Sequence, residues 1–262
     1  MRGYSYIGVL KSLTKNNLLN DYENILGCSI GSIFSLLFVL GYTAEELEAI
    51  IPKIDTNIFS DIDYNNIIEF PSTYGLCDIN KIIKVVDILI KAKTKNKDIT
   101  FKELYDITNK NLIIISTCLN KCKSVYFNYI DYPDLIVSEA IKMSLCVPYL
   151  FSPIKYNDCL FVDGAILDTF PISYFKDDID NTIGIVLNKD SKFIDINTLE
   201  DYFKVLCFSS NFNKLNDLLE KYSKNCIVIE CNTECFNFDL SIEQKLKLIN
   251  CGYKSTEKYI ES

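Results

Sequence analysis

The chain has no histidine among its 262 residues. This absence excludes a Ser-His-Asp triad or a Cys-His pair built from the chain's own residues, because both need an imidazole as the base. If a serine of this protein acts as a nucleophile, its proton must pass to a carboxylate, to a lysine or to a group that a partner supplies. The 11 cysteines contain no Cys-x-x-Cys pair. With no histidine beside them, we expect no metal and no cofactor.

Arginine is also scarce, and acidic residues outnumber basic ones. The formal net charge is −8, and Arg2 is the only arginine among 27 basic residues. No long basic run is present, which argues against nucleic acid as the main partner. The lysine-rich stretch from Lys91 to Lys97 has two interpretations. The favoured one is the solvated end of a helix, and the other is a local contact with lipid headgroups.

Long apolar segments are missing too. The longest apolar run, which follows Ser32, is about half as long as a membrane-spanning helix requires. Met1 leads directly into a mixed segment with no signal-peptide pattern. The cysteines are odd in number and scattered, so reduced thiols in a reducing compartment are the default expectation. We therefore expect a cytoplasmic protein whose contact with membranes, if it has one, is peripheral.

The most informative stretch that is present reads Gly27-Cys28-Ser29-Ile30-Gly31 and leads into an apolar run ending near Leu40. Glycines permit a tight turn and a close approach of neighbouring elements. The Gly-x-Ser-x-Gly pattern between a strand and a helix is typical of an elbow that exposes a nucleophilic serine. The helix amides beside that serine favour developing negative charge. A chance match remains open on this pattern alone.

A second stretch, Phe161-Val162-Asp163-Gly164-Ala165, ends an apolar strand with an aspartate and a glycine turn. Sites of α/β proteins lie at the carboxyl ends of their strands, so we expect Asp163 and Ser29 at the same edge of the sheet. The alternative is an ordinary Asp-Gly turn, and without the first motif that alternative would be preferred.

The periodicity of the whole chain predicts an α/β fold with a mostly parallel sheet, in a single domain covering residues 1–262. Capping boxes at Thr43, Thr100 and Ser241 mark three helix starts. The stretch 56–77 is polar and contains Pro71 and Gly75, which favours an irregular connection, with a mobile cover over the site as the alternative. The expected helices are 3–13, 30–40, 43–52, 78–93, one that begins at Thr100, 134–146, 199–222 and 241–262, and the expected strands are 23–27, 112–117, 124–129, 160–163, 183–187 and 227–230.

Together, Gly27–Gly31 and Asp163–Ala165 resemble the patatin-like phospholipase family. Three further segments are similar to that family in order and spacing. They are Met1–Leu10, Ser144–Pro153 and Leu167–Ile172. The resemblance covers nearly the whole chain and is weakest between residues 56 and 97. It implies a three-layer fold whose central sheet is flanked by helices.

The resemblance implies a serine–aspartate dyad that hydrolyses acyl esters of phospholipids or other lipids. Ser29 would be the nucleophile and Asp163 the proton acceptor, with Gly27, Cys28, Ile30, Gly31, Gly164 and Ala165 as their motif neighbours. A free aspartate has a pKa of about 3.9 and is a poor base at neutral pH. We therefore predict that apolar surroundings raise the pKa of Asp163.

One departure from the family concerns the glycine-rich oxyanion motif, of which only Arg2 and Gly3 match. The first strand of the family fold is also not found. We expect either that the natural protein is longer at its N-terminus, which is the favoured explanation, or that the oxyanion hole has been lost. A single oxyanion donor is worth about 3 kcal/mol, so loss of two or more, together with a core strand, would nearly abolish turnover and reduce stability.

Three other functions remain open. A catalytically impaired relative would bind lipid or regulate another protein without turnover. A transferase would pass the acyl group to an acceptor other than water. A structural or interaction domain with coincidental motifs is disfavoured by the number of matching segments. The lipid substrate, the acyl position and the oligomeric state do not follow from the sequence.

Overall fold

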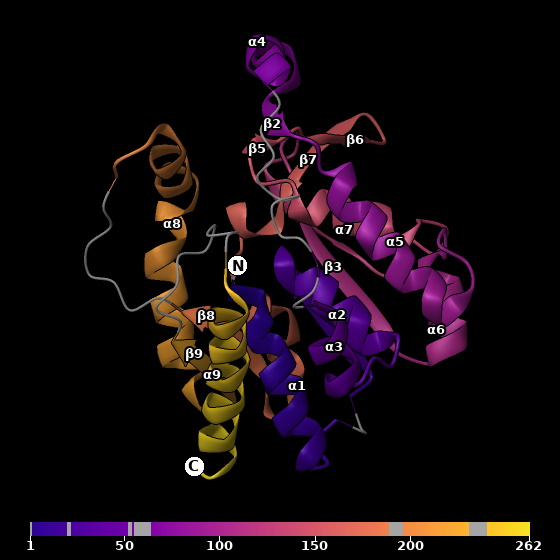
Figure 1. Cartoon of the computed structure of the whole chain (residues 1–262), viewed down its shortest axis with the longest axis vertical. Helices are drawn as coiled ribbons and strands as arrows, with labels where there is room; N and C mark the ends of the chain where they lie inside the picture. The colour runs from indigo at the N-terminus through magenta and orange to yellow at the C-terminus, as the bar shows by residue number, and fades with distance from the viewer. Residues whose placement is uncertain (1, 20–21, 52–53, 55–63, 189–195, 231–239) are drawn as a thin grey trace.

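The computed structural model describes residues 2–19, 22–51, 54, 64–188, 196–230 and 240–262 (Figure 1). Its helices are α1 (Ser5–Lys15), α2 (Ile30–Val39), α3 (Ala44–Ile50), α4 (Tyr64–Thr73), α5 (Asn80–Thr94), α6 (Phe101–Thr108), α7 (Val137–Leu145), α8 (Leu199–Lys221) and α9 (Ile242–Ile260). Its strands are β1 (Asn24–Cys28), β2 (Gly75–Cys77), β3 (Asn111–Cys118), β4 (Lys123–Phe127), β5 (Tyr149–Phe151), β6 (Ile154–Tyr156), β7 (Cys159–Asp163), β8 (Gly184–Asn188) and β9 (Cys226–Glu230).

The helix starts follow the local sequence signals. At α3 the Thr43 hydroxyl accepts a hydrogen bond from the amide of Glu46, and the Glu46 carboxylate accepts one from the amide of Thr43. The boxes expected at Thr100 and Ser241 form in the same way. Each helix and each strand expected from the sequence is present, with its ends shifted by a few residues at most.

The expected irregular connection at 56–77 is wrong for its described part, because α4 and β2 occupy residues 64–77; residues 56–63 lie outside the described ranges. Pro71 lies inside α4. Its missing amide removes one helical hydrogen bond, yet the amide of Tyr74 still bonds to the carbonyl of Phe70 at 2.8 Å. A proline near the end of a helix was mistaken for a break.

Strand β3 organises the central sheet, whose order is β1-β3-β7-β6 with β4 also paired to β3. Among the described strands of this sheet, the β1–β3 pairing is parallel, whereas β3–β4, β3–β7 and β6–β7 are antiparallel. The α/β class is confirmed, but this sheet is mixed rather than mostly parallel. Strands β6 and β7 are joined by a short connection and form a hairpin, so they run antiparallel. Strand β7 also runs antiparallel to β3, and these two pairings make the sheet mixed.

Strands β1 and β7 meet end to end along the same side of β3. Cys28 pairs with Ile115, and Asp163 pairs with the next residue, Ser116. Strand β4 pairs with both Ile115 and Ser116, so it occupies the opposite side. Because β1 runs parallel to β3 and β7 runs antiparallel to it, the last residues of β1 and β7 converge. This convergence brings Ser29 and Asp163 together.

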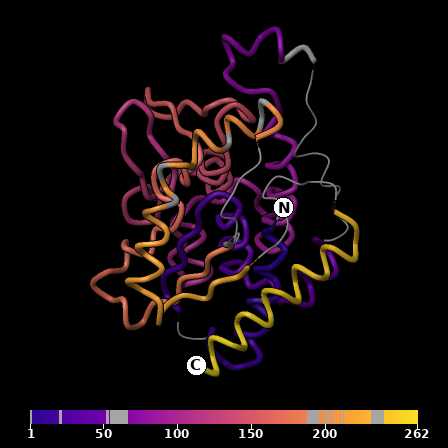
Figure 2. The backbone as a smooth tube through the Cα atoms, turned by 90° about the vertical axis from the view of Figure 1, so that its left-hand side faces the viewer, coloured from indigo at the N-terminus to yellow at the C-terminus, as the bar shows by residue number. Residues whose placement is uncertain are grey.

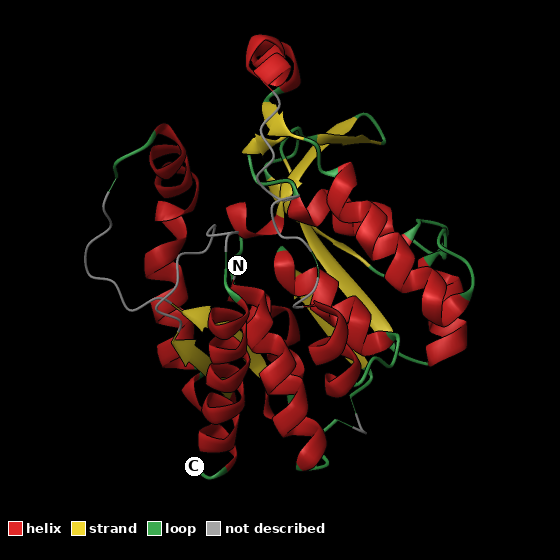
Figure 3. Ribbon diagram, viewed as in Figure 1, coloured by secondary structure: helices red, strands yellow, loops and turns green. Residues whose placement is uncertain are grey.

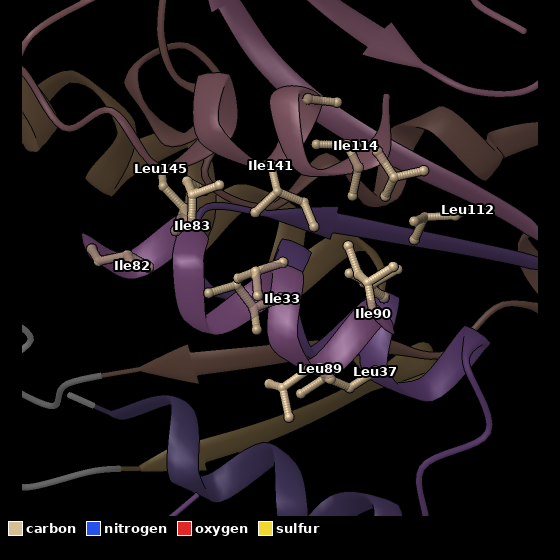
Figure 4. Close-up of a cluster of buried hydrophobic side chains, with 14 of the residues drawn as sticks. Ile33, Leu37, Ile82, Ile83, Leu89, Ile90, Leu112, Ile114, Ile141 and Leu145 are labelled. Carbon is tan, nitrogen blue, oxygen red and sulfur yellow. The ribbon is translucent and has the colours of Figure 1, made fainter. Parts of the chain in front are cut away.

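Helices α2, α5 and α7 cover one face of this sheet (Figures 3 and 4). Ile33 and Leu37 of α2 lie between α5 and the sheet, where Ile90 and Ile114 are also fully or almost fully buried (Figure 4). The run 30–39 is apolar on nearly all sides because α2 is enclosed in this way. The buried helix expected after Ser29 is thus confirmed.

Helices α1 and α9, from the two ends of the chain, lie side by side (Figures 1 and 2). Two glycines make this contact possible. A Cβ atom at Gly8 would lie 1.8 Å from the carbonyl oxygen of Ile249, and one at Gly252 would lie 2.0 Å from that of Ser5. Helix α9 also packs on β9, which pairs in parallel with β8. Across the described ranges, none of the helices has the length and apolar character that crossing a bilayer requires.

Candidate active site

Ser29 occupies a sharp turn between β1 and α2. Its backbone has φ 51° and ψ −131°, a conformation that residues with a side chain rarely adopt. Such strain is found at functional sites, where the surrounding structure maintains it. Gly27 permits the turn, since a Cβ atom there would lie 2.5 Å from the Cα of Ser32. The local geometry is therefore that of the elbow expected from the sequence.

Gly31 differs from Gly27. A Cβ atom at Gly31 would meet nothing closer than the Tyr6 hydroxyl, at 3.5 Å. The expected close approach is thus required at Gly27 but not at Gly31.

Asp163 ends β7 and faces the serine. Its Oδ2 accepts a hydrogen bond from Ser29 Oγ at 2.5 Å, and its Oδ1 accepts one from the amide of Ala165 at 2.8 Å. The Asp163 amide donates to the carbonyl of Cys146 at 2.9 Å. Both carboxylate oxygens and the backbone are therefore held in place.

The Asp163 side chain is completely buried. Burial raises the pKa of Asp163 to about 7, although the hydrogen bonds from Ser29 and Ala165 oppose the rise. The predicted elevation of this pKa is confirmed. A carboxylate with a pKa near neutrality can accept a proton far better than a free aspartate can.

Other motif residues surround the pair. A Cβ atom at Gly164 would lie 2.6 Å from the carbonyl oxygen of Ile115, so the turn after Asp163 passes directly over β3. The Cys28 thiol donates to the carbonyl of Asp168 at 3.6 Å. This contact connects the residue before the serine with the segment that follows the aspartate.

Arg2 and Gly3 make different contacts. A Cβ atom at Gly3 would lie 2.9 Å from Ile30 Cγ1, so Gly3 packs against the first turn of α2. The Arg2 guanidinium instead donates to the carbonyl of Leu187 in β8 at 3.1 Å. Gly3 is the member of this pair that lies beside the site.

Two buried serines near the site were missed by sequence reasoning. Ser144 Oγ accepts the amide hydrogen of Ser29 at 3.0 Å. Ser116 Oγ contacts the carbonyl oxygens of Met143 at 3.1 Å and Val162 at 2.7 Å, which joins β3 to α7 and β7. The available signal was a polar side chain inside an otherwise apolar segment, because buried hydroxyls are rarely without a hydrogen-bonding task.

A cavity of about 50 Å³ lies on the α5 side of α2. Its lining is wholly apolar and includes Gly3, Ile30, Phe34, Val85 and Leu89. Ile30 directly follows Ser29 in the sequence. A residue adjacent to the serine therefore lines the cavity.

These features place the protein among α/β proteins with a serine elbow and a buried acidic partner. The family model described as patatin-like phospholipase matches residues 1–176. The chain belongs to the patatin-like phospholipase family.

Individual relatives agree with this assignment. The chain is 30% identical to an uncharacterised protein of Acanthamoeba polyphaga mimivirus, over 98% of this chain and 90% of that protein. It is 32% identical to a probable lipid hydrolase of invertebrate iridescent virus 6, over 66% of this chain and 59% of that protein. Among solved structures, VipD from Legionella pneumophila matches with a TM-score of 0.58 and 15% identity, over 99% of this chain and 65% of VipD. This last likeness supports the shared fold.

Proposed function

We propose that this protein hydrolyses acyl esters of lipids, with Ser29 as nucleophile and Asp163 as general base. The observation that carries the proposal is the 2.5 Å hydrogen bond from Ser29 Oγ to Asp163 Oδ2 in a chain without histidine. Because no imidazole is available, the buried Asp163 carboxylate, whose pKa is raised, is the proposed base for Ser29. We also propose that residues 1–262 act as a single domain.

The reaction has two stages. Ser29 Oγ attacks the ester carbonyl while Asp163 accepts its proton, and that proton is then given to the departing alcohol as the acyl-enzyme forms. Asp163 next takes a proton from water, and the hydroxide attacks the acyl-enzyme. The fatty acid leaves as the proton returns to Ser29, which restores the dyad.

The negative charge that develops on the carbonyl oxygen needs donors. Ser29 precedes the first turn of α2, and the first amides of a helix have no partner within the helix. We propose that the start of α2 supplies part of the oxyanion hole. Gly3 packs on that turn and is the proposed remaining element of the glycine-rich motif, with Arg2 anchoring the segment through Leu187.

An acyl chain is the proposed occupant of the apolar cavity beside Ile30. Its lining offers no polar partner to a charged or sugar-like group, but it suits methylene groups. The names of the family and of the iridescent-virus relative support a lipid substrate.

The test is release of free fatty acid from phosphatidylcholine vesicles by the whole chain, compared with Ser29→Ala. A matched control is Ser72→Ala, because Ser72 is an exposed serine of α4. Fatty acid released by the wild type and by Ser72→Ala, but not by Ser29→Ala, supports the proposal. Equal vesicle binding by the wild type and Ser29→Ala, with turnover by neither, would support a lipid-binding protein instead. Appearance of a new ester in place of free fatty acid would support acyl transfer.

A further inference from the structure

Helix α8 reaches back to the turn that follows Asp163. The Asn211 side chain is only 7% exposed, and its Nδ2 donates to the carbonyl oxygens of Ala165 at 2.7 Å and Ile166 at 3.0 Å. An asparagine amide has two N–H groups, so both can be used by this pair of carbonyls. The buried Asn211 amide thus donates its hydrogen bonds to Ala165 and Ile166, the two residues that end the turn after Asp163.

Ala165 links this contact to the candidate base. Its amide donates to Asp163 Oδ1 at 2.8 Å, while its carbonyl accepts from Asn211. The same carbonyl also accepts from Thr169 Oγ1 at 3.2 Å, which is a longer bond within the same segment. Asn211 therefore joins the Ala165 carbonyl to a distant element, α8.

A second residue of α8 supports the same contact. Lys214 lies three positions after Asn211, so both project from one face of the helix. Its Nζ donates to the carbonyl of Leu167 at 3.2 Å and pairs with the Asp168 carboxylate at 3.3 Å. Lys214 is about half exposed, so its contribution is small. Both residues lie beyond 1–176, the part that the family model matches.

We propose that Asn211 is a positioning residue that holds the Gly164–Ile166 turn so that Asp163 faces Ser29. The inference rests on the proposed function of that pair. Asn211 touches neither the serine nor the carboxylate, so it acts through the backbone of Ala165. The proposal gives α8 a role in the reaction although it contributes no reacting group.

The alternative is that Asn211 only satisfies buried carbonyls and stabilises the fold. The two explanations differ in pH dependence. The Ala165 amide bond lowers the pKa of Asp163, so a turn that drifts away raises that pKa and moves the acid limb of the reaction to higher pH. A purely structural asparagine would leave the acid limb unchanged.

Other titratable groups near Asp163 do not obscure this readout. The Cys28 thiol at the end of β1 and the Cys146 thiol after α7 both interact with Asp163, and burial raises the pKa of each. Neither thiol therefore ionises in the range where Asp163 titrates. Asp168 lies further along the segment and pairs with Lys214.

The experiment compares Asn211→Ala with Asn225→Ala. Asn225 is a matched control, because its Nδ2 also donates to two carbonyls, those of Ile179 at 2.8 Å and Thr182 at 3.2 Å, in a different part of the fold. The rate of fluorophosphonate labelling of Ser29 is followed from pH 5 to 9, below the melting temperature of each variant. Amide hydrogen exchange of the peptide containing Ala165 is measured in parallel, and Asn211→Gln tests rescue.

We expect Asn211→Ala to label about tenfold more slowly at pH 7, with its acid limb at higher pH and faster exchange at Ala165. Asn225→Ala should match the wild type in all three, and Asn211→Gln should recover part of the rate. Unchanged exchange, or faster exchange with an unchanged labelling profile, would overturn the proposal. A folded wild type that is never labelled would refute the proposed function instead. The exchange data would then still decide whether Asn211 holds the turn, since exchange needs no activity.

Discussion

Residues 1–176 and residues 196–262 contribute differently to this molecule. The first region matches the family model and contains both Ser29 and Asp163. The second contributes no reacting group to our proposal, yet it contacts the first through Asn211 in α8 and through Gly252 in α9. In our proposal the motifs of the first region carry the chemistry, whereas part of the geometry they need is maintained by a region that the family model does not match.

The largest expected effect lies in the first region. Asp163→Asn removes the base but keeps the shape of the side chain, so we expect ester hydrolysis to fall about a thousandfold. The control is Asp158→Asn, because Asp158 is a fully exposed carboxylate in the turn before β7. Initial rates on a short p-nitrophenyl ester measure both variants. Near-normal hydrolysis by Asp163→Asn would show that another group is the base.

The next effect tests the second region. Gly252→Val places a branched side chain where a Cβ atom would already lie 2.0 Å from the Ser5 carbonyl oxygen. We expect a loss of about 3 kcal/mol in the free energy of unfolding, because α1 and α9 must separate. Lys254→Val introduces the same side chain at an exposed position of α9 and should cost far less. Urea denaturation compares them, and equal midpoints would contradict the close helix contact.

The pH dependence of the free energy of unfolding tests the raised pKa of Asp163 in the first region. The pKa of Asp163 is about 7 when folded and near 3.8 when unfolded, so between these values the folded state binds the extra proton. The contribution of Asp163 to stability should therefore be largest at acidic pH and decline as pH rises towards 7, by about 3 kcal/mol between pH 5 and 8. Asp163→Asn should remove this decline. Parallel pH profiles of unfolding for the two proteins would contradict the raised pKa.

The smallest effect concerns the apolar cavity. Val85→Phe should fill part of it and displace about two methylene groups of a bound chain, which costs about 1.5 kcal/mol or roughly tenfold in rate on a long-chain ester. A butyrate ester should be unaffected. The control is Ile88→Phe, because Ile88 is 67% exposed on the same helix, α5. Equal losses on short and long esters with Val85→Phe would remove the cavity from the substrate-binding proposal.

Local patterns predicted the elements of the site. The strand, elbow and buried helix around Ser29 follow from two glycines and an apolar run, which act within a few residues. These features depend on short-range chemistry, which a sequence displays directly. The raised pKa of Asp163 was predicted from the role that the family resemblance implies, since a free aspartate is a poor base at neutral pH.

The relation between the strands was not predictable in the same way. We expected Ser29 and Asp163 to meet because parallel strands end at one edge of a sheet. They meet instead because β1 and β7 run towards each other beside β3, with partners Ile115 and Ser116. Strand direction depends on pairings between distant residues, which the alternation of apolar residues does not encode. Asn211 was missed for the same reason, because its partners lie 45 and 46 residues away.

The central claim is that Ser29 is a nucleophile activated by Asp163. The most direct test treats the folded protein with a fluorophosphonate at pH 8 and locates the adduct by mass spectrometry, beside Ser29→Ala and Asp163→Asn. We predict one adduct, on the peptide containing Ser29, with none in Ser29→Ala and strongly slowed labelling in Asp163→Asn. A folded wild type that stays unlabelled, or an adduct that persists in Ser29→Ala, would contradict the claim.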